Sequence, residues 1–135
     1  MEIRRKSGFT LIELLLVLVI LSVLAAVVVP KFTNRSKQSK IAATKASIAT
    51  IAMAIDSFEV DCGRFPNDLK ELMVQPMDTP GWNKPYLSKP VNADPWGRPF
   101  VFRQPGAINP DGFDLYSAGP DGQEGNDDDI CSWNL

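Results

Sequence analysis

Hydrophobic positions dominate the start of the chain. Of the 21 residues from 9 to 29, only three are polar. At about 1.5 Å of rise per residue, a helix of this length covers about 30 Å, which is the thickness of a bilayer core. A basic cluster at residues 4–6 precedes it, and by the positive-inside rule this cluster predicts a cytoplasmic N-terminus. We therefore expect one membrane-spanning helix over residues 9–29.

One acid, Glu13, interrupts this apolar segment. A carboxylate there costs about 2.5–3.5 kcal/mol on insertion scales. Because Glu13 lies near the cytoplasmic end, its side chain could reach back toward the interface and reduce the cost. The alternative, which we favour, is that Glu13 meets a positively charged partner in an assembled state.

Beyond Pro30 the pattern changes to that of an amphipathic helix. Apolar side chains recur at spacings of three and four, which predicts one stripe that packs against a head domain. The stripe consists of Ile48, Ile51, Ile55 and Phe58. Because Pro30 lacks a backbone donor, we expect it to loosen the helix rather than end it. Residues 30–62 are thus predicted to form the second half of one long helix, on the non-cytoplasmic side of the membrane.

The remaining residues, 63–135, are predicted to form one small α+β head. Gly63 and Pro66 signal the end of the long helix. The expected elements are a short helix over 67–73 with Asn67 as its N-cap, a proline- and glycine-rich loop over 76–90, and two antiparallel strands over 100–103 and 113–117. Trp96 and Phe100 are expected to be core anchors.

Composition narrows the function classes. The chain has a net charge of −2, which does not indicate nucleic acid as a partner, and no histidine, which excludes histidine-based catalysis and histidine metal ligands. We therefore expect a protein that is not an enzyme. A head of this size has a limited core and needs additional stabilisation.

Two cysteines, Cys62 and Cys131, could supply it. Their even number and the predicted oxidising compartment favour a disulfide, although two free thiols are the alternative. Closing the 69-residue loop between them would contribute roughly 4 kcal/mol in the chain-entropy model.

The C-terminal loop is strongly acidic, with five acids between Asp121 and Asp129. Carboxylates on a glycine-rich loop are the ligands that calcium prefers, although the spacing is not that of an EF-hand. From the charges alone, a solvated turn and a calcium site are equally good interpretations.

The N-terminal residues carry a family resemblance. The run from Lys6 to Glu13, KSGFTLIE, resembles the class III signal of type IV pilins and type II secretion pseudopilins. The resemblance implies that a prepilin peptidase cleaves after Gly8 and methylates the new terminal amine of Phe9. An ordinary secretory signal peptide is the competing interpretation, but no polar region follows the apolar run.

The head also resembles a family, the major pseudopilins of type II secretion systems. The resemblance lies in Asp94-Pro95-Trp96-Gly97, in the run from Asp114 to Gly122, and in Asp129-Ile130. It implies a calcium-binding loop that stabilises the subunit. The ligands that it implies are Asp121, Asp127 and Asp129, a backbone carbonyl at Leu115, and Asp128 as a substitute. We expect Glu124 to face solvent.

The resemblance implies a structural subunit that polymerises into the periplasmic pseudopilus of a type II secretion system and drives the export of folded proteins across the outer membrane. Its implied partners are other copies of itself in a helical homopolymer, minor pseudopilins, the prepilin peptidase, the inner-membrane assembly platform and, before assembly, membrane lipid. In the filament, Glu13 would meet the Phe9 amine of a neighbour. The alternatives are a type IV pilin, a DNA-uptake pseudopilin, or a single-pass anchored calcium-binding domain.

Overall fold

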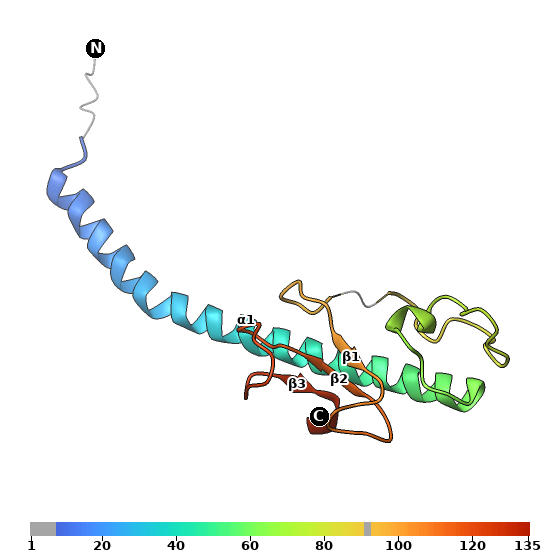
Figure 1. Cartoon of the computed structure of the whole chain (residues 1–135). Helices are drawn as coiled ribbons and strands as arrows, with labels where there is room; N and C mark the ends of the chain where they lie inside the picture. Colours follow the sequence, from blue (N-terminus) through green and yellow to red (C-terminus); the bar gives the residue numbers. More distant parts are fainter. Residues whose placement is uncertain (1–7, 91–92) are drawn as a thin grey trace, which may run out of the picture. The chain divides into compact units, whose positions relative to one another are not determined.

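The structure, a computed structural model, describes residues 8–90 and 93–135, without the side chains of residues 29–33. It divides into two compact units, the first ending at Ser36 and the second beginning at Lys37. The elements, in which η denotes a short 3-10 helix, are α1 (Leu11–Cys62), η1 (Leu69–Leu72), β1 (Val101–Arg103), β2 (Asp114–Ser117), β3 (Ile130–Cys131) and η2 (Ser132–Asn134) (Figure 1). A long N-terminal helix followed by a small antiparallel sheet confirms the predicted fold class.

Helix α1 contains 52 residues and continues through Pro30, as the pattern predicts. It ends at Cys62, where the next residue, Gly63, has a φ of +71°. Glycine adopts this left-handed conformation without the clash that a Cβ atom would cause, and its N–H donates to the Glu59 carbonyl at 2.8 Å. The C-terminal boundary of the helix is therefore fixed by local chemistry.

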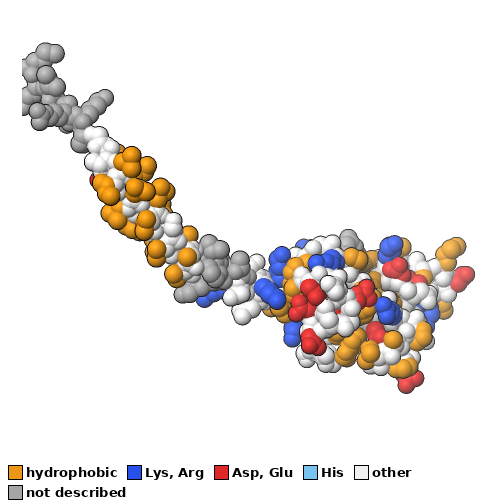
Figure 2. All heavy atoms as spheres, turned by 60° about the vertical axis from the view of Figure 1, so that its left-hand side comes forward, with side chains coloured by type: hydrophobic (Ala, Val, Ile, Leu, Met, Phe, Trp, Pro, Cys, Tyr) orange, Lys and Arg blue, Asp and Glu red, His pale blue; other side chains and the backbone are white. Residues whose placement is uncertain are grey.

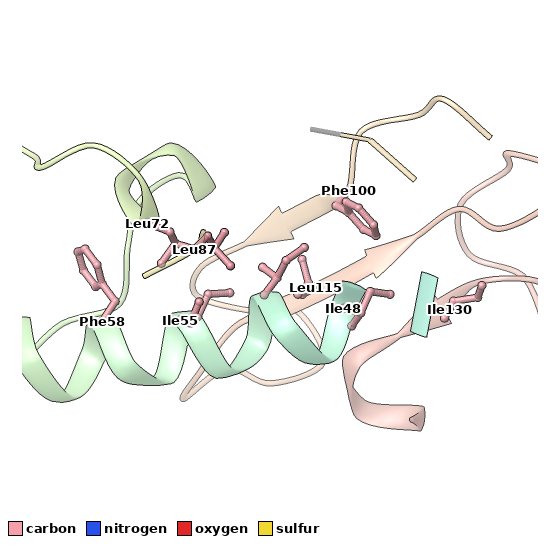
Figure 3. Packing of buried hydrophobic residues seen from close by; sticks show 10 residues of the cluster. Ile48, Ile55, Phe58, Leu72, Leu87, Phe100, Leu115 and Ile130 are labelled. Carbon is pink, nitrogen blue, oxygen red and sulfur yellow. The ribbon is translucent and has the colours of Figure 1, made fainter. Parts of the chain in front are cut away.

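The core of the second unit lies between α1 and the sheet (Figure 3). All four residues of the predicted stripe are fully buried, at 0% exposure. They pack against Leu72, Leu87, Phe100, Leu115 and Ile130. Burial of each such side chain contributes roughly 1.5–3 kcal/mol. The second half of α1 is therefore part of the head.

The sheet has the strand order β1-β2-β3, and both pairs are antiparallel. Phe102 is paired with Leu115, and Tyr116 with Cys131. The two predicted strands and their hairpin are confirmed. The third strand was not predicted, because two residues are too few to show an alternating pattern.

The segments between α1 and β1 are held by side chains. As expected, aromatic residues pin the loop over 76–90: the Trp82 indole N–H donates to the Glu71 carbonyl at 2.9 Å, and the Tyr86 ring packs edge-on against Phe58. The predicted short helix is the 3-10 helix η1, but its N-cap is Asp68, not Asn67. The Asp68 carboxylate accepts the Lys70 N–H at 2.9 Å.

Candidate functional site

The tail exposes its apolar side chains. Residues Leu11–Val28 have a mean hydropathy of 3.1, and none of them is buried; Figure 2 shows hydrophobic side chains along this part of the helix. Its length and composition are those of a membrane span. A second apolar stretch, Asn34–Cys62, has a lower mean hydropathy of 1.3 and supplies the stripe buried in the head core.

Glu13 occupies the first turn of α1 and forms a capping box with Thr10. The Thr10 hydroxyl accepts the Glu13 N–H at 3.3 Å, and the Glu13 carboxylate accepts the Thr10 N–H at 3.4 Å. This reciprocal arrangement satisfies two donors that the first turn would otherwise leave unpaired. This role was not predicted, although the spacing Thr-x-x-Glu is visible in the sequence. Glu13 thus has a structural role within one chain that does not exclude a partner in an assembly.

The structure corrects the expected disulfide, because Cys62 and Cys131 are both free thiols. Cys131 follows Ile130, which lies beside Ile48, whereas Cys62 is one turn beyond Phe58 at the other end of the buried stripe (Figure 3). Ile48 and Cys62 are about 21 Å apart along the helix, and a disulfide requires Cα atoms within about 7 Å. Burial also raises the pKa of the Cys131 thiol, with smaller contributions from Asp129 and Asp114, so the thiol stays protonated.

The Asp94-Pro95-Trp96-Gly97 motif has a structural function. Asp94 is 5% exposed. One of its carboxylate oxygens accepts the N–H groups of Trp96 and Arg98 at 3.0 and 2.9 Å, and the other accepts the Ser117 hydroxyl at 2.7 Å. The motif therefore fastens the turn before β1 to the end of β2, next to the acidic loop.

The acidic loop is held by its own hydrogen bonds. Both oxygens of Asp121 accept hydrogen bonds, from the Gln123 N–H at 2.9 Å and from the Asn126 side-chain amide at 2.8 Å. The Asn126 side-chain oxygen accepts the Asp128 N–H at 2.8 Å. Asn126 thus links two of the predicted ligand residues, and this role was not predicted for it.

The remaining predicted ligands differ in their exposure and in their hydrogen bonds. Asp127 is exposed, and the Leu115 side chain is fully buried in the core. One Asp129 oxygen accepts the Gly125 N–H at 2.7 Å, whereas the other is buried and has no hydrogen-bond partner. In residues 8–90 and 93–135, no three acidic, histidine or cysteine side chains form a group that could hold a metal ion. The buried oxygen of Asp129 therefore calls for a cation or another donor.

Glu124 is exposed, as expected, but it also contacts the sheet. Its carboxylate accepts the Tyr116 hydroxyl at 2.6 Å and pairs with the Arg103 guanidinium at 3.2 Å, although half of the side chain is exposed. Burial and the bond to Glu124 raise the pKa of Tyr116 to about 12, so the hydroxyl remains a donor at neutral pH. Glu124 therefore joins the acidic loop to β1 and β2.

Comparison with known proteins identifies relatives of the whole chain. The sequence model of the family described as "Type II secretion system (T2SS), protein G" matches residues 31–133, and the one described as "Prokaryotic N-terminal methylation motif" matches residues 3–29. The type II secretion system core protein G of Pseudomonas aeruginosa is 43% identical, over 99% of both chains. Core protein G of Aeromonas hydrophila is 35% identical, over 100% of this chain and 97% of its own.

A solved structure has the same fold. The crystal structure of the major pseudopilin from the type 2 secretion system of enterohaemorrhagic Escherichia coli superimposes with a TM-score of 0.64, covering 76% of this chain and 89% of its own, at 24% identity. The protein G family model covers the head, whereas the N-terminal methylation motif covers only residues 3–29. The chain belongs to the type II secretion system protein G family.

Proposed function

We propose that the chain is a structural subunit, and not an enzyme, that polymerises into the periplasmic pseudopilus of a type II secretion system. The observation that carries this proposal is the similarity to core protein G over both full lengths. The exposed apolar tail supports it, because one chain alone leaves this surface uncovered. Lipid would cover the tail before assembly, and neighbouring tails would cover it in the filament. Extension of the filament would then drive folded proteins across the outer membrane.

The N-terminal motif supports a route into the filament. The prepilin peptidase would cleave after Gly8 and methylate Phe9, leaving residues 9–29 as a single span of the inner membrane with the head in the periplasm. The inner-membrane assembly platform and the minor pseudopilins would be the other protein partners. Phe9 is 79% exposed, so a peptidase and, later, a neighbouring subunit have access to it.

Glu13 would then pair with the Phe9 amine of an adjacent subunit. In the filament core a lone carboxylate and a lone amine are each costly, and they become tolerable as a pair. A subunit in the wrong register would leave both groups unpaired. We therefore assign to Glu13 the role of fixing register among the tails, in addition to its capping of α1.

We also propose that the acidic loop binds calcium. Asp129 would bind the ion through its unpartnered oxygen. Asp121, Asp127 and the Leu115 carbonyl would be further oxygen ligands, with Asp128 as a substitute. Calcium would supply a positive charge that offsets the mutual repulsion of these acids. Glu124 would keep the loop attached to the sheet, because its own contacts need no metal.

The proposed function is tested by intact mass spectrometry of the subunit in filaments released from the periplasm of its native host. We expect a mass that begins at Phe9 and carries one added methyl group. A chain that begins at Met1, recovered only from membranes and never from filaments, would instead indicate a simple anchored domain. Electron microscopy of the same preparation checks that filaments are present.

A further inference from the structure

The side chain of Arg98 reaches the acidic loop from the turn before β1. The backbone of Arg98 is fixed by that turn, because its N–H donates to the Asp94 carboxylate at 2.9 Å and its carbonyl accepts the Asp94 N–H at 2.7 Å. The side chain is half-buried, and its guanidinium donates to the Gly119 carbonyl at 2.6 Å. Arg98 therefore joins a fixed turn to the backbone two residues before Asp121.

Two glycines leave the space that this contact requires. Gly119 and Gly122 have φ angles of +61° and +76°, a conformation that residues with a Cβ atom rarely adopt. A Cβ atom at Gly122 would overlap the Arg98 guanidinium, and one at Gly119 would overlap the backbone carbonyl of Asp128. The guanidinium and the Asp128 backbone are therefore both packed directly against the backbone of residues 119–122.

The Arg98 guanidinium contacts the backbone of the acidic loop without pairing with its acids. Among residues 8–90 and 93–135, no salt bridge involves Arg98, and the guanidinium donates to a neutral carbonyl instead. The negative charges of Asp121, Asp127 and Asp129 are therefore not offset by a direct bond to this arginine. Arg98 supports the loop and leaves the proposed ligands free to bind another cation.

We propose that Arg98 is a positioning residue for calcium, which holds the backbone of residues 119–122 in place before the ion binds. This inference rests on the calcium binding proposed for the acidic loop. Ordering a loop on binding lowers the affinity, so a loop that is ordered in advance binds more tightly. The positive charge of Arg98 acts in the opposite direction, but solvent and salt screen a half-exposed charge, whereas the contacts with the loop backbone are direct.

Arg103 offers a matched comparison, because it brings the same charge to the same loop. Its guanidinium pairs with Glu124 at 3.2 Å, and the two side chains are 53% and 51% exposed. An exposed ion pair contributes little, and the Tyr116 hydroxyl still holds Glu124 when the arginine is removed. Loss of Arg103 therefore changes the charge beside the loop without releasing the loop backbone.

Calorimetric titration of the full-length, detergent-solubilised chain with calcium tests the inference. We expect Arg98→Met to weaken calcium binding about tenfold, because methionine keeps an apolar stem but donates no hydrogen bond, so that the loop must be ordered by the ion. Arg98→Lys should lose less, since an ammonium can still donate to the Gly119 carbonyl. Arg103→Met, the control with the same change in charge, should bind within about threefold of the wild type.

Thermal melts in chelator show whether each variant is folded at the temperature of the titration. If Arg98→Met is not, Arg98→Lys decides, and it should bind calcium more weakly than the wild type. A folded Arg98→Met that binds calcium as tightly as the wild type, or more tightly, would overturn the inference, even if its melting temperature falls. An equal loss in Arg103→Met would also overturn it. A wild type that binds no calcium would overturn the proposed calcium binding, and this inference with it.

Discussion

Single residues attach the loops of the head to its sheet, and Asp114 is the most deeply buried carboxylate that does so. It is 2% exposed. Its oxygens accept the N–H groups of Ala107, Ile108 and Asn109 at 2.6, 2.8 and 3.0 Å. Burial alone would raise the pKa of Asp114, but the three donors outweigh burial and lower the pKa below its usual value.

We predict that Asp114→Asn destabilises the head in a pH-dependent way. Because the pKa is lower in the folded than in the unfolded chain, the carboxylate stabilises fully above its unfolded pKa of about 3.9, and this stabilisation is lost as the pH falls through the folded pKa. The free energy of unfolding should fall by about 1–3 kcal/mol at pH 7. Urea unfolding of the detergent-solubilised chain should show a difference that shrinks below about pH 4. A difference that is constant with pH would contradict the role of the charge.

The acidic loop gives a second prediction at this scale, the response to calcium. With free calcium about tenfold above the dissociation constant, binding to the folded state alone adds about 1.4 kcal/mol, which is roughly 3–8 °C in melting temperature. A chelator should therefore lower the melting temperature of the wild type by several degrees.

Asp121→Ala should make the melt the same with calcium and with chelator. The comparison between the two conditions matters, because Asp121→Ala also removes two hydrogen bonds and lowers the melting temperature in both. Asp111→Ala, an exposed acid outside the loop, is the matched control and should respond to calcium like the wild type. A wild type that melts identically in both conditions would favour a solvated turn.

At the scale of elements, the sequence predicted the helix and the strands that have a recognisable pattern of apolar residues. The stripe from Ile48 to Phe58 has helical spacing, and the hairpin has aromatic and branched residues on both sides of a turn-rich loop, so both could be found before the fold was known. The strand β3 is too short to carry a pattern. It exists because the backbone of Ile130 and Cys131 pairs with β2, and such pairing is decided by tertiary structure.

The candidate site was less predictable than the elements. Glu124 contacts residues from two strands that lie 21 and 8 positions away, and no local pattern signals such a contact. The number of cysteines and their compartment favoured a disulfide, but neither says that the two residues lie at opposite ends of the core. The capping box was visible in the sequence and was overlooked, because Glu13 was interpreted only through its charge.

At the scale of the whole molecule, the two units require different surroundings. The head buries its own apolar stripe, so it needs no partner to cover it. The tail from Leu11 to Val28 buries none of its residues. Removing apolar surface from water contributes about 25 cal/mol per Å², so an apolar covering would stabilise this helix, and lipid and neighbouring tails are the coverings that we propose. Glu13 is the one acid in this helix, and its role depends on whether lipid or neighbouring tails surround it.

We therefore predict that Glu13→Ala and Glu13→Gln are both processed and inserted but lower filament yield by about a hundredfold or more, because loss of one partner of a buried ion pair costs about 3–5 kcal/mol. The two variants separate the roles of Glu13, since glutamine can still form the capping box with Thr10 but carries no charge. Thr10→Ala is the converse control: it removes the half of the box that the Thr10 hydroxyl makes, keeps the charge and should assemble. If Glu13→Gln assembles normally while Glu13→Ala and Thr10→Ala fail, the capping of α1, and not an ion pair with the Phe9 amine, is what assembly requires.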